Sequence, residues 1–349
     1  MRLEPRTEAT FWLRAMAPIL AVIVALALCG FLILWAGAPL LEAYAALARG
    51  ALGSRFALSE TLTRATPLIF TGLAVAVAFR AKLWNIGGEG QLYAGALAAT
   101  WVGTGAIDLP AYLMIPAIFS AAALAGGLLL LLPTLLKIRL KVDEVVTTLL
   151  LNFVVLLFVN YLLFGPWKDP LSMGWPQAAP IVNSGLLPNL VDRTRLHFGL
   201  LAGLVASVAV WIVMRFTHWG FEIRAVGLNT PAAVFAGIPV NATVVRTALL
   251  SGGLAACAGV TEVCGTKGYL TLDISPGFGY TGIAVAMLAG LHPLGVVVSA
   301  VFVAAIYNGA DSMSRAVGIS NYLADVMTAV ALLAVLVSSL LVQYRIRRG

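Results

Sequence analysis

The hydrophobic pattern of this chain is a series of continuous apolar runs separated by short polar segments. A helix that crosses a bilayer needs about twenty consecutive apolar residues, whereas a membrane β-barrel alternates over segments of about ten residues. The runs cover 15–35, 62–80, 86–107, 111–136, 144–165, 198–217, 244–266, 279–291, 292–309 and 321–343. The pattern therefore predicts an all-α protein, a polytopic transmembrane helical bundle with about ten spans.

Two of these runs need a separate interpretation. The run 279–291 is too short to cross a bilayer alone as a straight helix, so 279–309 is predicted to form two short helices or a re-entrant hairpin. The run 15–35 exceeds the roughly 7–15-residue apolar core of a signal peptide, so it is read as a retained first span. We expect a single transmembrane domain over 1–349, with the first span and an external segment within 1–60.

Composition agrees with this class. Apolar residues make up 61% of the chain and charged residues 11%, against about a quarter charged in soluble proteins. Mean hydropathy is +0.97, which excludes an ordinary soluble enzyme. The net charge of +7 comes from basic residues at the ends of apolar runs. Membrane topology and contact with anionic lipid explain it better than nucleic-acid binding.

The distribution of Lys and Arg predicts the orientation, because cytoplasmic loops are enriched in both. With ten spans and a cytoplasmic N-terminus, the cytoplasmic set is Arg2, Arg6, Arg14, Arg80, Lys82, Lys137, Arg139, Lys141, Arg215, Arg224, Arg246, Arg345, Arg347 and Arg348. These are 14 of the 22 basic residues. Both termini are then cytoplasmic and the long loop 166–197 faces outward.

One irregular stretch lies at the start of the third span, where Asn85–Leu92 reads NIGGEGQL. Irregular backbone at membrane depth is tolerated only inside protein or along a wet cavity, and an ionisable residue there indicates a functional site. An ordinary cytoplasmic turn is the alternative, and the nearby Arg80 and Lys82 favour it.

A second stretch, 220–239, follows a helix end that is predicted to be cytoplasmic. Thr230 is a suitable N-cap, Pro231 suits the first helical position, and Gly237 suits a left-handed C-terminal cap. The stretch therefore predicts one short helix over Pro231–Ala236, with Phe235 left without an apolar partner. Such a helix is typical of a docking element, and a loop packed on its own bundle is the alternative.

These residues resemble the permease subunits of ATP-binding-cassette (ABC) importers, in the branch that includes ribose, branched-chain amino-acid and nucleoside permeases. The form of the 85–92 motif resembles the nucleoside (guanosine-type) permeases. So do Leu151–Phe153, Gly165–Pro170, Gly279–Ala286 and Pro293–Gly295. Trp84 and Gly88 stand where Phe and Ala are common in that branch, and neither change should alter the backbone.

The resemblance implies a non-enzymatic subunit in a bacterial plasma (inner) membrane. It implies a separate ATPase subunit that binds ATP, a second, related but distinct permease, and an external substrate-binding lipoprotein. This sequence contains no phosphate-binding loop of its own, and we expect no metal and no cofactor in it. A nucleoside is the implied solute. Import of ribose or another simple sugar, or of a purine base, remains open, as does ion-coupled secondary transport.

Candidate site residues fall into two groups. Substrate-path candidates are Asn85, Glu89, Gln91, Tyr93, Asn152, Phe153, Glu262 and Asn308. ATPase-coupling candidates are Arg224, Gly227, Asn229, Thr230, Pro231, Ala233, Phe235 and Gly237. A polar residue inside a span often holds helices together instead, and Glu89 could order the glycine-rich turn by accepting backbone N–H bonds.

Overall fold

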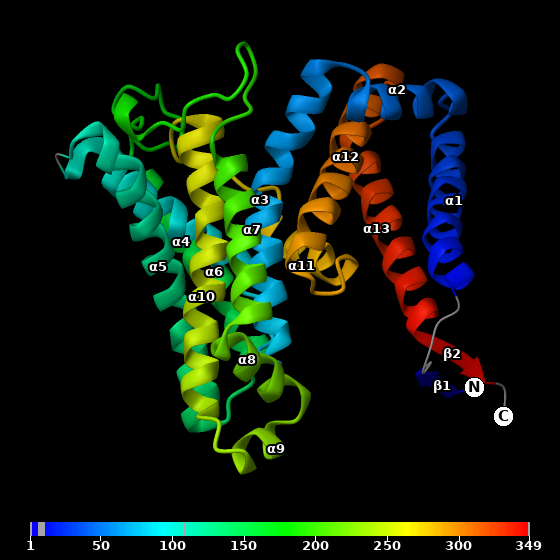
Figure 1. The fold of residues 1–349 in the computed structure, drawn as a ribbon. Coiled ribbons are helices and arrows are strands. Elements are labelled where there is room, and N and C mark those ends of the chain that lie inside the picture. The colour runs from blue at the N-terminus through cyan, green and yellow to red at the C-terminus, as the bar shows by residue number, and fades with distance from the viewer. Residues whose placement is uncertain (1, 6–10, 108, 348–349) are drawn as a thin grey trace. The chain divides into compact units, whose positions relative to one another are not determined.

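The structure is a computed structural model that describes residues 2–5, 11–107 and 109–347 (Figure 1). Its helices are α1 Phe11–Trp35, α2 Leu40–Leu52, α3 Arg55–Arg80, α4 Gly88–Trp101, α5 Ala111–Leu140, α6 Glu144–Phe164, α7 Gly199–Phe216, α8 His218–Leu228, α9 Thr230–Phe235, α10 Val240–Val260, α11 Phe278–Leu288, α12 Pro293–Val317 and α13 Asn321–Gln343. Strands β1 Arg2–Pro5 and β2 Tyr344–Arg347 pair antiparallel. Arg6 and Arg348 of the predicted cytoplasmic set lie outside the described residues.

The prediction of a helical membrane protein is confirmed. Within the described part of the chain, six helices are long and apolar enough to cross a membrane, namely α3, α5, α6, α7, α10 with its π-helical extension Thr261–Lys267, and α12. The count of about ten spans stays a prediction.

Three boundaries differ from the hydrophobic pattern. Helix α3 begins at Arg55 instead of 62, and the segment before it contains an additional helix, α2. The polar residues of these two stretches interrupt an apolar run, but they do not end a helix. Helix α12 continues to Val317, so the run 292–309 belongs to a 25-residue helix. Helix α11 has 11 residues and a length of about 16 Å, roughly half the hydrocarbon core. The segment 279–309 is therefore one short and one long helix.

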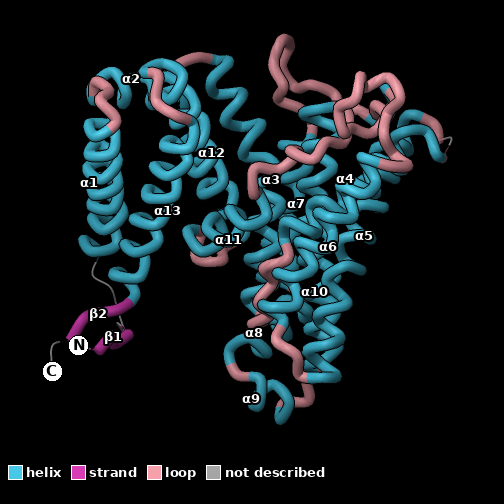
Figure 2. The backbone as a smooth tube through the Cα atoms, turned by 180° about the vertical axis from the view of Figure 1, so that it is seen from behind, coloured by secondary structure: helices cyan, strands magenta, loops and turns pink. Residues whose placement is uncertain are grey.

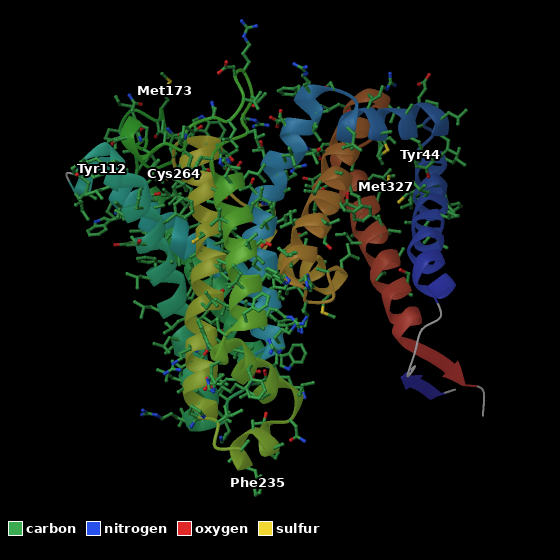
Figure 3. The ribbon with its side chains drawn as sticks, in the orientation of Figure 1. Tyr44, Tyr112, Met173, Phe235, Cys264 and Met327 are labelled. Carbon is green, nitrogen blue, oxygen red and sulfur yellow. The ribbon has the colours of Figure 1, made fainter. Side chains whose placement is uncertain are left out.

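The chain divides into two compact units. One contains Met1–Thr61 and Phe302–Gly349, and the other contains Leu62–Val301. In the first unit, α1, α2, α12 and α13 bury a cluster that includes Cys29, Ile33 and Met327, and Figure 3 labels Met327 and Tyr44 there. The candidate residues of the sequence, apart from Asn308, belong to the second unit.

Helix α10 is central in the second unit and packs against both α4 and α5, which also contact each other (Figures 1 and 2). Glycines allow the backbones to approach closely. A Cβ added to Gly95 of α4 would lie 2.1 Å from the carbonyl oxygen of Ala256, and one added to Gly126 of α5 would lie 2.3 Å from that of Gly252. Small residues at such contacts are the usual means by which membrane helices pack.

The loop 166–197 forms a cap on one end of this unit (Figure 1). Backbone N–H groups of the cap donate to the segments that follow α4 and α10: Val182 to the carbonyl oxygen of Gly103 at 2.8 Å, and Leu187 to that of Cys264 at 2.8 Å. The end of the cap carries His197, which is fully buried. Its Nδ1 accepts the Gly199 N–H at 3.1 Å, and its Nε2 has no hydrogen-bond partner in the described part of the chain.

Acid should weaken the cap through His197. Burial lowers the pKa of its imidazole from 6.5 to about 4, so between these values the unfolded state binds more protons than the folded state. The stabilisation is complete above about pH 6.5 and is lost as pH falls towards 4, by up to about 3 kcal/mol. We expect the thermal midpoint of the detergent-solubilised protein to fall between pH 7 and 4.5. The His197→Gln variant should be less stable at pH 7 and show a smaller fall. An equal fall in both proteins would assign the acid sensitivity elsewhere.

Candidate functional site

The NIGGEGQL stretch forms a buried turn that leads into α4. Asn85, Glu89 and Gln91 are each less than 5% exposed. The two amides pair reciprocally: Asn85 Nδ2 donates to Gln91 Oε1 at 2.9 Å, and Gln91 Nε2 donates to Asn85 Oδ1 at 2.8 Å. Asn85 Oδ1 also accepts the Gly87 N–H, and its Nδ2 also donates to Ser251 of α10. The side chains of Asn85 and Gln91 therefore fix the turn itself.

One face of α6 supplies hydrogen bonds to this irregular backbone. Glu144, Thr148 and Asn152 are spaced four apart, so they lie on one helix face, which we call the α6 polar stripe. Glu144 Oε1 accepts the Trp84 N–H at 3.3 Å, and Thr148 Oγ1 accepts the Ile86 N–H at 3.3 Å. Backbone without regular structure needs such partners inside a membrane protein. Of these three residues only Asn152 is a candidate from the sequence, although the four-residue spacing is visible in the run 144–165.

Asn152 bonds to more segments of the chain than the other members of the stripe do. Its Oδ1 accepts the Gly90 N–H at 2.8 Å, and its Nδ2 donates to the carbonyl oxygen of Ile86 at 3.0 Å and to the Tyr280 hydroxyl at 3.1 Å. Gly90 lies in the first turn of α4, where backbone N–H groups have no partner within the helix. Asn152 thus joins α6, the start of α4 and the start of α11.

The first turns of α4 and α11 meet at a contact between Gly88 and Gly279, which we call the glycine crossing. A Cβ added to Gly279 would lie 2.1 Å from the backbone nitrogen of Glu89. The Glu89 carboxylate accepts the Gly279 N–H at 2.7 Å, and the Tyr93 hydroxyl donates to the carbonyl oxygen of Leu272 at 2.7 Å. Glu89 is expected from the sequence either to line the substrate path or to accept backbone N–H bonds within the glycine-rich turn. It does accept a backbone N–H bond, but the donor belongs to α11 and not to the turn.

The remaining substrate-path candidates lie elsewhere. Phe153 follows Asn152 directly, yet its side chain is 56% exposed while Asn152 is fully buried. Glu262 is buried in the π-helical extension of α10, where its charged neighbours include Lys267 and Arg195. Asn308 belongs to the other unit and donates to Thr61 Oγ1 at 3.1 Å. The structure thus brings five of the eight candidates into one cluster: Asn85, Glu89, Gln91, Tyr93 and Asn152.

The predicted coupling segment contains two helices where the sequence analysis predicted one. Residues up to Leu228 form α8, and α9 follows from Thr230. The N-cap of α9 is Asn229, whose Oδ1 accepts the Ala232 N–H at 3.1 Å, and not Thr230. The Thr230 hydroxyl donates back to the carbonyl oxygen of Val226 at 2.9 Å, so its side chain bonds to the preceding helix α8. Pro231 is the second residue of α9 and not the first, because the helix begins one residue earlier. Gly237 is confirmed in the left-handed region, with φ of 77°.

Helix α9 has one buried side and one exposed tip. Ala233 is 3% exposed and packs in a cluster with Leu83 and Val226, whereas Phe235 is 96% exposed. Figure 3 shows Phe235 pointing away from the bundle at the end of this unit. Helix α8 presses on the end of α3, since a Cβ added to Gly227 would lie 1.8 Å from the carbonyl oxygen of Arg80. Helices α8 and α9 therefore contact the end of α3 and the segment that leads into the buried turn.

Replacing Asn152 by leucine should destabilise the protein. The change leaves the Gly90 N–H and the Ile86 carbonyl unpaired in a buried place, at a cost of about 1–3 kcal/mol for each group. We expect lower yield and a thermal midpoint lower by several degrees in Asn152→Leu. The adjacent exposed position provides the matched control, because Phe153→Leu should change neither. A stable Asn152→Leu protein that has lost only its transport would instead assign Asn152 to solute binding.

The fold and the buried turn define a class, a multi-pass helical membrane protein with discontinuous helices. The profile of the family described as the permease component of branched-chain amino-acid transport systems matches residues 57–336, and the chain belongs to this family. It is therefore a transport permease component and not an enzyme.

Individual relatives narrow the class to ABC transporter permeases. The guanosine ABC transporter permease protein NupP of Bacillus subtilis is 37% identical, and the match covers 92% of this chain and 92% of the relative. The glucose ABC transporter permease protein TsgB13 of Haloferax volcanii is 35% identical over 100% of this chain and 95% of its own. The nucleoside ABC transporter permease protein NupB of Lactococcus lactis is 31% identical over 90% of this chain and 89% of its own.

Proposed function

We propose that this chain is the permease subunit of an ABC importer that moves nucleosides, or related small polar solutes, into the cell. The observation that carries the proposal is the exposed tip of α9. An aromatic side chain that is 96% exposed, on a short helix capped at both ends, is suited to insertion into a partner protein. The partner we propose is a separate ATPase subunit that binds ATP.

Contacts within the second unit give that docking a route to the buried turn. Ala233 of α9 packs in one cluster with Leu83, which is two residues before Asn85. Gly227 of α8 touches the backbone of Arg80, where α3 ends. A displacement of α9, together with α8, therefore acts on the end of α3 and on the segment that follows it. We propose that the turn moves with α9 and changes access to the pore.

The nucleoside assignment rests on the relatives and on the chemistry of the turn. Two of the three relatives reported above are named for nucleosides or guanosine. A neutral, polar, flat solute needs amide partners and apolar walls with no fixed charge opposite it. Asn85, Gln91 and Tyr93 can offer such groups if the turn opens during transport.

Sugar import is the second candidate function, because the Haloferax volcanii relative is named a glucose permease. Uptake of radiolabelled guanosine by cells that express the complete transporter separates the two. We expect unlabelled nucleosides to compete for uptake and glucose, ribose and purine bases to fail. Uptake of radiolabelled glucose and not of radiolabelled guanosine would assign the chain to sugar import.

We further propose that the chain lies in a bacterial plasma membrane with about ten spans and both termini in the cytoplasm. A related, distinct permease completes the pore and an external lipoprotein delivers the solute. Co-purification of the tagged chain, followed by identification of the bound subunits, tests this assembly. Recovery of this chain with its own copy and no second permease would contradict the heteromeric pore.

Labelling of introduced cysteines tests the orientation. Met173 in the loop 166–197 is 98% exposed and Phe235 is 96% exposed, and Figure 3 places them at opposite ends of the second unit. In cells that express the chain without its ATPase, we expect an impermeant thiol reagent to label Met173→Cys while the cells are intact and Phe235→Cys only after permeabilisation. The parent chain controls for Cys29, Cys257 and Cys264. The reverse pattern would invert the topology.

A further inference from the structure

A basic cavity of about 260 Å³ lies beside the coupling helices in the second unit. It is lined by the last turns of α3 and α7, by α8, and by the turn between α11 and α12. Its charged and titratable lining side chains are Arg80, Arg215, Arg224 and His292. The described residues that line it include no carboxylate, so the cavity gathers positive charge without an internal counter-ion.

Arg80 is held in place by hydrogen bonds although the charge of Arg224 repels it. The guanidinium of Arg80 donates to the carbonyl oxygen of Leu291 at 3.2 Å, which fixes it against the turn between α11 and α12. The positive charge of Arg224 acts on Arg80 across the cavity. Glu222, an acidic residue on the same helix as Arg224, does not line the cavity. Its carboxylate contacts His218 Nδ1 at 3.2 Å and accepts a hydrogen bond from the Thr243 hydroxyl at 3.2 Å. Since no carboxylate lines the cavity among the described residues, an anion bound there would relieve this repulsion.

The geometry points to a binding site for a phosphate group, and we propose that an anionic phospholipid headgroup is its occupant. Arginine presents a planar set of donors that matches phosphate oxygens. Basic pockets between membrane helices on the cytoplasmic side bind such headgroups. Trp211, one turn before Arg215 on α7, also lines the cavity, and tryptophan is enriched at membrane interfaces. The location at a helix end favours a lipid over a free cytoplasmic anion.

Occupancy of this site would have a mechanical consequence. The lining residues join the end of α3 and the turn between α11 and α12 to α8, which leads directly into α9. A bound phosphate removes the repulsion between Arg80 and Arg224 and ties these elements together. Anionic lipid would thereby stiffen the same segments through which α9 reaches the buried turn.

Binding to the purified full-length permease in detergent, without ATPase or solute, tests the site independently of transport. Short-chain phosphatidylglycerol, phosphatidylcholine and inorganic phosphate are compared by native mass spectrometry and by thermal shift. We expect phosphatidylglycerol to bind and stabilise the protein and phosphatidylcholine to do neither. Arg215→Gln should weaken the affinity about tenfold, because it removes a hydrogen bond to a charged group.

The matched control is Arg246→Gln, which makes the same charge change at an exposed residue of α10 that does not line the cavity. It should retain wild-type affinity. If inorganic phosphate alone gives a shift that depends on Arg215, the site binds phosphate as such and the lipid assignment is replaced. No dependence on Arg215 with either ligand, or an equal loss in Arg246→Gln, overturns the site.

Discussion

Replacing Phe235 by aspartate should abolish ATP-driven uptake while leaving insertion and folding intact. The side chain is 96% exposed, so the isolated permease loses no packing. In the proposed complex the same side chain enters an apolar socket on the ATPase. An unpaired carboxylate there costs roughly several kcal/mol, enough to reduce association a thousandfold or more. Uptake by intact cells and co-purification of the ATPase measure the two effects.

The matched control for this substitution is Met173→Asp. Met173 is also apolar and 98% exposed, but it lies on the loop 166–197 at the opposite end of the second unit (Figure 3). It should leave ATPase association unchanged. Normal uptake and normal association in Phe235→Asp would remove α9 from the coupling mechanism and would leave the assignment to the permease family untouched.

Replacing Gly279 by alanine should strongly lower the free energy of unfolding of the protein. The added Cβ would lie 2.1 Å from the Glu89 nitrogen and 2.4 Å from the carbonyl carbon of Gly88. Both are backbone atoms, which cannot rotate away as a side-chain end can. Separating α4 from α11 would also break the hydrogen bond from Gly279 to Glu89. Overpacking of this kind costs about 1–3 kcal/mol before the lost hydrogen bond is counted.

Yield in the membrane and the thermal midpoint in detergent measure this effect. Gly203→Ala is the control, because it makes the same change on α7 where the new Cβ meets only side chains, at 3.4 Å or more. We expect Gly203→Ala to match the parent. A Gly279→Ala protein as stable as the parent, and active, would show that α4 and α11 can separate at the glycine crossing without loss.

Several features could be predicted from the sequence because they depend on local chemistry. Apolar runs located the membrane helices, since the bilayer imposes their length and composition. Pro231 and Gly237 located α9, since each suits one backbone conformation. The buried turn at Asn85 was identifiable because glycines and a carboxylate are rare between apolar spans.

Hydrogen-bond partners could not be predicted, because they lie far apart in the sequence or on elements that the sequence did not indicate. The partner of Glu89 is Gly279, 190 positions away, and no local pattern indicates it. Asn152 is a solute-binding candidate as an amide within an apolar run, and no local pattern indicates that the fold brings Gly90, Ile86 and Tyr280 to it. The error over Thr230 has a similar cause, since its hydroxyl bonds to Val226 of the preceding helix, which was not predicted.

The glycine crossing also affects the electrostatic potential around the buried turn. Each helix N-terminus carries the positive end of a macrodipole, equivalent to about half an elementary charge. Helices α4 and α11 bring two such ends together, which amounts to roughly one positive charge. The carboxylate of Glu89 sits between them, and in its ionised form it offsets that charge. A buried turn whose charges balance in this way attracts neither cations nor anions, so it suits the passage of an uncharged solute.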